Sequence, residues 1–160
     1  MIRILVVEDF DLIRQGVISL IRQQTAWHVV GEASNGLQAI EKAAELKPDF
    51  VILDASLPQL SGWEATPLIR KAVPTCRVLI LSQHDGVYAV REAVRVGASG
   101  YVCKSDAGRD LVKAIQALLR EEEFFTSSSS SSTGQNGAAA NSQDPVSDKS
   151  VAGNIPESAA

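Results

Sequence analysis

The sequence predicts a doubly wound α/β domain, in which helices cover both faces of a five-stranded parallel sheet. Five short apolar stretches alternate strictly with five longer stretches of helical periodicity. Several of the short stretches are almost continuously apolar, which is typical of strands buried on both faces of a parallel sheet. Right-handed crossovers would connect these strands, so their carboxyl ends should share one edge of the sheet.

The predicted strands are short and rich in Val, Ile and Leu. They cover residues 2–7, 28–33, 50–53, 78–82 and 100–103. The third and fourth strands are preceded by Pro48 and Pro74, each of which ends the helix before it.

Apolar residues in the longer stretches recur at helical spacing and are expected to face the sheet. The helices are predicted at residues 11–24, 36–46, 63–73, 86–96 and 106–120. The inward positions in these helices are expected to be Leu12, Ile13, Val17, Leu20 and Ile21; Leu37, Ile40 and Ala44; Leu68, Ile69 and Val73; Val90, Ala93 and Val94; and Leu111, Ile115, Leu118 and Leu119.

Helix ends and one internal proline complete the predicted secondary structure. Asn35 is a predicted N-cap, as are Ser105 or Asp106 and the stretch 9–11. Pro67 lies within the third helix, so we expect that helix to be shortened, kinked or begun late.

Composition narrows the class of function. The 160 residues carry a net charge of −4, so nucleic-acid binding through a basic excess is not expected. No apolar run approaches the roughly 18 residues of a membrane-spanning helix. Acidic residues interrupt the N-terminal stretch too early for a signal peptide. Cys76 and Cys103 form no CxxC pair, which indicates free thiols in a cytoplasmic protein.

The apolar periodicity ends near Phe125. Six consecutive serines begin at Ser127, and residues rich in Gly, Ala, Asn and Asp follow. A segment of this composition buries too little apolar surface to offset its chain entropy. We therefore predict one domain over residues 1–125 and a disordered Ser/Gly/Ala-rich tail over residues 126–160. A short partner-binding motif within that tail is the alternative.

Charged and hydroxyl side chains stand where four of the five strands end. The first strand ends in Glu8 and Asp9, and the third ends in Asp54. The fourth ends in Ser82 and the fifth in Lys104. The ligand site of an open parallel sheet lies beyond the carboxyl ends of its strands. We therefore expect these side chains to converge on one cleft.

Three carboxylates in one cleft repel one another unless a cation intervenes. Lys104 supplies one positive charge, and a divalent cation would balance the other two negative charges. Carboxylate oxygens that form an incomplete cage suit Mg²⁺, which keeps several water ligands. Zinc is not expected, because His28 and His84 lie in separate segments and the cysteines do not cluster.

These features together resemble the receiver domain of two-component response regulators over residues 1–125. The resemblance rests on the acid pair Glu8-Asp9, the segment Asp54-Ala55-Ser56-Leu57-Pro58 with Gly62 after it, Ser82, and Gly100-Tyr101-Val102-Cys103-Lys104. Residues 81–85 and 98–101 look most like the NarL/FixJ subfamily. The resemblance implies a flavodoxin-like (βα)5 receiver fold with strand order 2-1-3-4-5.

The resemblance also implies a role for each site residue. Asp54 would take a phosphoryl group from a phosphohistidine. Asp9 and Asp54 would ligate Mg²⁺ directly, and Glu8 would do so through water. The backbone carbonyl of Ser56 would complete the protein ligands. Lys104 and the metal would neutralise charge on the group in transfer.

Ser82 and Tyr101 form the switch that the resemblance implies. Once Asp54 is phosphorylated, the Ser82 hydroxyl would turn toward a phosphate oxygen, and Tyr101 would turn inward into the space left. Tyr101 as fixed packing is the alternative. Ser105 stands where many receivers have proline, so the isomer of the Lys104–Ser105 bond is left open.

We expect a phosphorylated switch rather than a turnover enzyme, catalysing only its own phosphorylation and dephosphorylation. One rival is a pseudo-receiver that binds partners without phosphorylation, which the full set of site residues disfavours. Another is a Mg²⁺-dependent phosphohydrolase, which would need an acid where Ser56 stands. The third is the receiver half of a DNA-binding transcriptional regulator.

The expected partners are a sensor histidine kinase or a histidine phosphotransfer protein, and a downstream protein that the sequence does not identify. Relatives in the NarL/FixJ subfamily continue into a helix-turn-helix domain, whereas residues 126–160 lack its apolar pattern and basic charge. We therefore expect a stand-alone receiver that binds neither nucleic acid nor membrane. A homodimer through a helix face is left open.

Overall fold

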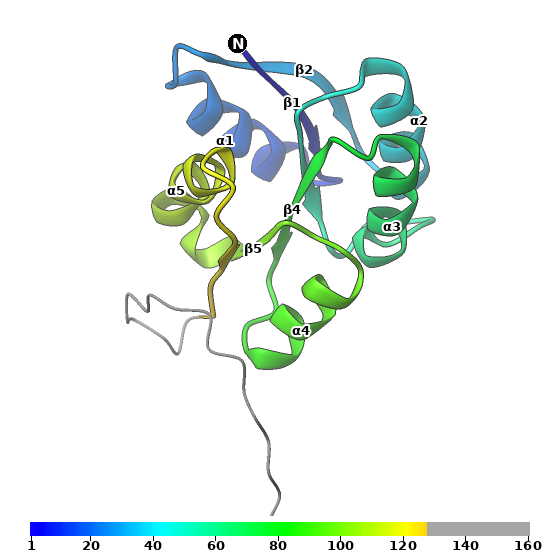
Figure 1. The fold of residues 1–160 in the computed structure, drawn as a ribbon, viewed down its shortest axis with the longest axis vertical. Helices are drawn as coiled ribbons and strands as arrows, with labels where there is room; N and C mark the ends of the chain where they lie inside the picture. The colour runs from blue at the N-terminus through cyan, green and yellow to red at the C-terminus, as the bar shows by residue number, and fades with distance from the viewer. Residues whose placement is uncertain (128–160) are drawn as a thin grey trace, which may run out of the picture.

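The computed structural model describes residues 1–127, which form one parallel sheet between two layers of helices (Figure 1). The strand order is β2-β1-β3-β4-β5-β6, and every neighbouring pair is parallel. The strands are β1 (Ile2–Val7), β2 (Trp27–Ala33), β3 (Phe50–Asp54), β4 (Arg77–Ser82), β5 (Gly100–Cys103) and β6 (Phe124–Phe125). The predicted parallel α/β class is confirmed.

The helices lie within two residues of their predicted bounds. They are α1 (Asp11–Arg22), α2 (Gly36–Leu46), α3 (Gly62–Ala72), α4 (Val87–Arg95) and α5 (Ala107–Leu119), with a short 3-10 turn, η1 (Lys104–Asp106), before α5. Figure 1 shows α1 and α5 on one face of the sheet, and α2 and α3 on the other, with α4 on that same side beyond β4. The helices therefore enclose the sheet from both sides.

Alternating side chains of the central strands form two separate cores. In β1, Leu5 and Val7 pack into the core shared with α2, α3 and α4, whereas Ile4 and Val6 pack into the core shared with α1 and α5. Because both faces are buried, each strand must be apolar at nearly every position. This explains the continuous apolar stretches of the sequence.

The sheet has one strand more than the five predicted. After α5 the chain turns back, and β6 pairs in parallel with Gly100 and Tyr101 of β5. The backbone N–H of Thr126 then donates to the Tyr101 carbonyl at 3.2 Å. A strand of two residues is too short to leave an alternating pattern, so the sequence does not reveal it. The order 2-1-3-4-5 holds and is extended by the sixth strand.

Several apolar side chains expected to face the sheet are exposed instead. They are Leu12, Leu37, Ala44, Leu68 and Val94. Within α2 and α3 the buried stripe is made mainly of small residues, namely Gly36, Ala39 and Ala43 in α2, and Gly62, Ala65, Thr66 and Ile69 in α3. Small residues let these two helices approach the sheet and each other closely, which leaves the larger leucines outside.

The helix starts agree only in part with the predicted N-caps. The Asn35 side chain accepts a hydrogen bond from the Gln38 N–H at 2.8 Å, as predicted for α2. Asp106 occupies the N-cap position of α5, as predicted, and Phe10 of the predicted stretch 9–11 occupies that of α1, but neither makes a side-chain cap hydrogen bond. The starts of α1 and α5 are therefore held by other contacts.

Helix α3 begins with a capping box that the sequence analysis missed. The Ser61 hydroxyl accepts from the Glu64 N–H at 3.2 Å, and the Glu64 carboxylate accepts from the Ser61 N–H at 3.1 Å. Contrary to expectation, Pro67 neither shortens this helix nor delays its start. Pro67 is exposed, so its ring meets solvent rather than the sheet.

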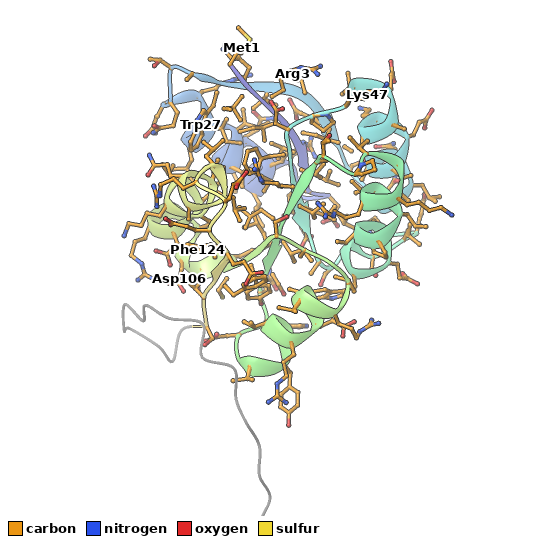
Figure 2. The ribbon with its side chains drawn as sticks, in the orientation of Figure 1. Met1, Arg3, Trp27, Lys47, Asp106 and Phe124 are labelled. Atoms are coloured by element: carbon orange, nitrogen blue, oxygen red, sulfur yellow. The ribbon has the colours of Figure 1, made fainter. Side chains whose placement is uncertain are left out.

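The amino edge of the sheet lies opposite the expected site. Figure 2 shows Met1, Arg3 and Lys47 together at this edge. The Arg3 N–H donates to Asp49 Oδ2 at 2.8 Å, and the Arg3 guanidinium donates to the Lys47 carbonyl at 3.1 Å. These bonds tie the start of β1 to the connection between α2 and β3, and fix the register of the strands whose other ends carry the site.

Most of the predicted tail, from residue 128 onward, lies outside the described residues, so the domain boundary at residue 125 stays a prediction. Within residues 1–127, no helix is long and apolar enough to cross a membrane. Cys76 and Cys103 are free and buried, and burial raises the pKa of Cys76 to about 12.

Candidate functional site

Three carboxylates meet at the carboxyl edge of the sheet. One oxygen from each of Glu8, Asp9 and Asp54 lies within 4.8 Å of the others. Glu8 and Asp54 are buried, with 2% and 3% of their surface exposed. The adjacent strands β1 and β3 deliver them, because the register pairs Val7 with Leu53 directly before the acids. The predicted convergence of these three side chains is therefore observed.

The backbone around Asp54 is held on both sides. The Ala55 N–H donates to the Leu81 carbonyl of β4 at 2.8 Å, and the Gly62 N–H donates back to the Ala55 carbonyl at 2.9 Å. A Cβ at Gly62 would lie 2.1 Å from the Asp54 carbonyl oxygen, so only glycine permits this close approach. The start of α3 thus packs directly against the end of β3.

Lys104, the first residue of η1 directly after β5, contacts the same carboxylates. Its Nζ lies 2.7 Å from Glu8 Oε2 and 3.1 Å from Asp54 Oδ1. Burial alone would lower the pKa of Lys104, but these two carboxylates outweigh burial and leave that pKa above its ordinary value. Lys104 therefore stays protonated. The peptide bond to Ser105, whose isomer was left open, is trans.

Glu8 experiences opposing influences. Burial raises its pKa, the Lys104 ammonium opposes that rise, and the negative charge of Asp54 adds to it. Its other oxygen, Oε1, accepts a hydrogen bond from the Phe10 N–H at 3.2 Å. Glu8 is therefore fixed at both oxygens, one by Lys104 and one by the backbone at the start of α1.

The arrangement fits a divalent cation coordinated by oxygen. With Lys104 protonated and the three acids ionised, the cluster carries a net charge of −2. Asp9 Oδ1 is buried without a hydrogen-bond partner among the described residues. An orphaned carboxylate oxygen is costly unless another cation satisfies it. The donors are oxygens that form an incomplete cage, as Mg²⁺ prefers.

Ser82 and Tyr101 lie beside this cluster on β4 and β5. The Ser82 hydroxyl accepts a hydrogen bond from the His84 N–H at 3.1 Å, and the Tyr101 hydroxyl donates to the His84 carbonyl. Burial raises the pKa of Tyr101, and a hydrogen bond with Ser82 opposes the rise. The Tyr101 side chain already lies inward and is fully buried.

A stacked pair of rings connects this region to α3. The ring centroids of Trp63 and Tyr101 are 6.5 Å apart, and the ring planes differ by 12°. Trp63 follows Gly62, whose N–H is bonded to the chain directly after Asp54. The indole therefore touches the inward tyrosine from the helix that packs against the end of β3.

Ser56 and Arg14 complete the description of the site. The Ser56 N–H donates to Asp54 Oδ1 at 3.2 Å, and the position of its carbonyl toward a metal stays a prediction. Sequence analysis missed Arg14, which donates from α1 to the Glu8 carbonyl at 2.8 Å. An arginine that bonds a backbone carbonyl six residues away has no recognisable sequence signature.

Comparison with known proteins adds a family match. A model described as the response regulator receiver domain matches residues 4–116. The transcriptional regulatory protein LnrK of Bacillus subtilis (strain 168) is 37% identical over 118 residues, covering 74% of this chain and 54% of that protein. The response regulator protein VraR of Staphylococcus aureus (strain Mu3 / ATCC 700698) is 35% identical over 119 residues, covering 74% and 57%. The chain spans about half the length of these curated relatives.

Two solved structures resemble the fold and share appreciable sequence identity. One is a two-component response regulator of the LuxR family from Aurantimonas sp. SI85-9A1, with 37% identity, a TM-score of 0.74, and coverage of 79% of this chain and 90% of that chain. The other is the signal receiver domain of the putative response regulator NarL from Mycobacterium tuberculosis, with 31% identity, a TM-score of 0.70, and coverage of 74% and 96%.

Proposed function

Because this chain belongs to the response regulator receiver family, we propose that Asp54 accepts a phosphoryl group from a histidine kinase or a histidine phosphotransfer protein in a Mg²⁺-dependent reaction. The observation that carries this proposal is the buried cluster of Glu8, Asp9 and Asp54 with Lys104 in contact. Phosphorylation then changes which downstream protein binds.

The proposed reaction forms an acyl phosphate. An oxygen of Asp54 attacks phosphorus, the P–N bond of the phosphohistidine breaks, and the imidazole nitrogen leaves with the bonding electrons. Asp54 Oδ1 already accepts from Ser56 N–H and contacts Lys104, whereas no hydrogen bond of the described residues involves Oδ2. We assign the attack to Oδ2, since it is the oxygen that the chain leaves free.

The other residues of the cluster would bind the cation and stabilise the charge of the phosphoryl group. Asp9 and Asp54 would hold Mg²⁺, which when bound neutralises charge on the transferring group. Glu8 is engaged by Lys104 at Oε2, so it suits a role through water rather than as a direct ligand. Lys104 sits 3.1 Å from Asp54 Oδ1 and would stabilise the phosphoryl oxygens once they arrive.

In this proposal, Ser82 and Tyr101 change conformation in response to phosphorylation of Asp54. A phosphoryl group on Asp54 adds negative charge that the Ser82 hydroxyl can meet by leaving its bond with the His84 N–H. Tyr101 also bonds His84, so the loop after β4 responds to both side chains. The inward Tyr101 is the position that the switch requires after phosphorylation, so we propose that phosphorylation increases its population.

This function is that of a switch that acts on its own phosphoryl group and releases no product from a separate substrate. A cytoplasmic location belongs to the same proposal, supported by two cysteines that are free thiols.

A transcriptional output is a second candidate, favoured by one observation. LnrK, which matches 74% of this chain, is named a transcriptional regulatory protein. The test is a chimera in which residues 1–127 replace the matching part of LnrK, assayed on the LnrK target promoter. Phosphodonor-dependent expression that Asp54→Ala abolishes supports this output, and expression indifferent to Asp54 opposes it.

The phosphoacceptor proposal is tested by the intact mass of the protein after incubation with acetyl phosphate. We expect one phosphoryl addition in wild type with Mg²⁺, and none with a chelator or in Asp54→Ala. Glu45→Gln, which removes an exposed acid on α2, should label like wild type. Labelling of Asp54→Ala at unit stoichiometry would place the acceptor elsewhere.

A further inference from the structure

Arg14 makes a three-way contact at the start of α1. Its Nη1 donates to the Glu8 carbonyl at 2.8 Å, its Nε donates to Glu32 Oε2 at 2.9 Å, and its Nη2 donates to the Asp11 carboxylate. Only 15% of the Arg14 side chain is exposed, whereas Asp11 is largely in solvent. The Glu32 side chain is 40% exposed, so the bonds to Glu8 and Glu32 are less open to water than the bond to Asp11.

Besides Arg14, two contacts hold the turn between β1 and α1: the Glu8 N–H donates to the Ala33 carbonyl at 3.0 Å, and the Phe10 N–H donates to Glu8 Oε1 at 3.2 Å. Phe10 caps α1 without a side-chain hydrogen bond. The Asp9 carboxylate accepts no hydrogen bond from the described residues, and its Oδ1 is buried. Nothing on its own side chain therefore fixes the direction of Asp9, so the direction must come from the backbone. Arg14 bonds the carbonyl of Glu8, which is one half of the Glu8–Asp9 peptide.

Glu32 gives Arg14 a firm anchor. It lies in β2, paired with Val6 of β1, one residue before the strand ends. Lys42 of α2 donates to the Glu32 carbonyl, which holds the backbone at this residue. Arg14 therefore connects the turn that carries Asp9 to a paired strand beside it. A guanidinium can make both bonds at once because its donors form a rigid planar fork, whereas an ammonium cannot reproduce that geometry.

We infer that Arg14 is a positioning residue for the cation site, which fixes the Glu8–Asp9 peptide so that the Asp9 carboxylate faces Asp54. This inference rests on the proposed function, since the site it serves is the Mg²⁺ site of that proposal. Groups that orient metal ligands without touching the metal typically change affinity 10- to 100-fold when they are removed. Arg14 would orient the metal ligand Asp9 in this way, without touching the metal itself.

The test measures binding of the metal alone. Mn²⁺ takes the same oxygen ligands as Mg²⁺, and its free concentration is read by electron paramagnetic resonance. We expect Arg14→Gln to bind Mn²⁺ about tenfold more weakly than wild type. Arg14→Lys, which keeps the charge but not the fork, should be weakened as well. The matched control is Arg22→Gln, which removes an exposed arginine in the last turn of the same helix and should leave affinity unchanged.

A second readout separates positioning from loss of the fold. With acetyl phosphate, Arg14→Gln should need about tenfold more Mg²⁺ for half-maximal labelling, while its rate at saturating Mg²⁺ returns to that of wild type. A merely structural role would lower the saturating rate or the melting temperature without shifting the Mg²⁺ dependence. If Arg14→Gln does not fold, Arg14→Lys carries the same comparison.

The outcomes distinguish this inference from the proposed function. Equal Mn²⁺ affinity in Arg14→Gln and Arg22→Gln overturns the positioning role, and so does full wild-type affinity in Arg14→Lys. Either result leaves Asp54 phosphorylation standing. Wild type that binds Mn²⁺ but takes no phosphoryl group overturns the proposed function and leaves the role of Arg14 in metal binding measurable. Wild type that binds no Mn²⁺ overturns both.

Discussion

Lys104 Nζ lies 3.1 Å from Asp54 Oδ1, although Asp54 ends β3 and Lys104 directly follows β5, which is not a neighbour of β3 in the sheet. β4 separates β3 from β5, so the lysine side chain spans the end of β4 to reach the acid. A cation is thus in contact with the proposed phosphoacceptor before any phosphoryl group arrives. Such preorganised charge requires no rearrangement during the reaction, which is how buried sites stabilise developing charge.

Replacing Lys104 should make the fold depend on divalent cations. Lys104→Ala leaves Glu8 and Asp54 buried without their counter-charge, and removing one partner of a buried ion pair costs about 3–5 kcal/mol. Bound Mg²⁺ would then meet three uncompensated carboxylates. We expect a lower melting temperature than wild type, and a larger rise when Mg²⁺ is added. Acetyl phosphate labelling should also slow.

The control for that experiment is Lys113→Ala, which removes an exposed lysine on α5. Thermal unfolding with and without Mg²⁺ gives the comparison. If Mg²⁺ raised the melting temperature equally in Lys104→Ala and Lys113→Ala, Lys104 would not compensate the negative charge of the site.

The stack of Trp63 on Tyr101 should make the indole a reporter of the switch. Beryllofluoride with Mg²⁺ mimics the phosphoryl group without hydrolysis, so we expect it to change Trp63 emission as Tyr101 and its neighbours shift. Trp27 packs into the opposite core with α1 and α5, so its emission should not change. The response should therefore survive in Trp27→Phe and vanish in Trp63→Phe. A flat titration in Trp27→Phe would remove Trp63 as a reporter.

The Arg109–Asp110 pair predicts a specific dependence of stability on pH. Two hydrogen bonds of 2.8 Å from Arg109 lower the pKa of Asp110 below its ordinary value of 3.8. The pair therefore stabilises the fold above that value, and this contribution is lost as pH falls through the lowered pKa. Arg109 is largely exposed, so we expect Asp110→Asn to cost about 0.5–1 kcal/mol at pH 7.

Urea unfolding at pH 7 and pH 3 measures this effect. The difference between wild type and Asp110→Asn should shrink at pH 3, because pH 3 lies below the ordinary carboxyl pKa of 3.8, where the stabilising contribution of the pair begins to be lost. Glu41→Gln, which removes an exposed acid on α2, should differ little from wild type at either pH. A difference for Asp110→Asn that stays constant between the two pH values would contradict the assignment.

The sixth strand should contribute measurable stability. Phe124 packs against the core with α1 and α5, and Phe125 packs against the opposite core. A chain that ends at Glu123 loses both contacts, so we expect it to be about 2–3 kcal/mol less stable in urea than a chain that ends at Ser127. The chain ending at Ser127 should match the full chain, since the sequence beyond it has little apolar surface to bury. Equal stability of the two shortened chains would show that β6 adds nothing.

The sequence predicted the sheet and the cluster well because both follow from simple patterns. Continuous apolar runs define strands buried on two faces, and the polar residue after each run must lie at the shared carboxyl edge. Glu8, Asp9, Asp54 and Lys104 could therefore be placed together before any coordinates. The order of these residues along the chain was sufficient for this prediction, because a parallel sheet places the carboxyl ends of its strands at one edge.

Other features depend on three-dimensional contacts that leave no local pattern. Arg14 of α1 bonds the carboxylate of Glu32, which lies 18 residues away in β2, and the backbone carbonyl of Glu8, so the sequence pattern reveals neither partner. The exposure of Leu12, at 86%, could not be told from helical spacing alone. The inward position of Tyr101 is a rotamer that the sequence does not specify, and it places the hydroxyl where it donates to the His84 carbonyl.

The most direct test of the central claim is borohydride trapping of the acyl phosphate, followed by peptide mass analysis. Borohydride reduces an aspartyl phosphate to homoserine, so the modified position is read from the sequence of one peptide. After wild type is treated with acetyl phosphate and Mg²⁺, we predict homoserine at position 54, with Glu8 and Asp9 intact. Reduction at Glu8 or Asp9, or no reduction while the intact mass shows a phosphoryl group, would contradict Asp54 as the acceptor.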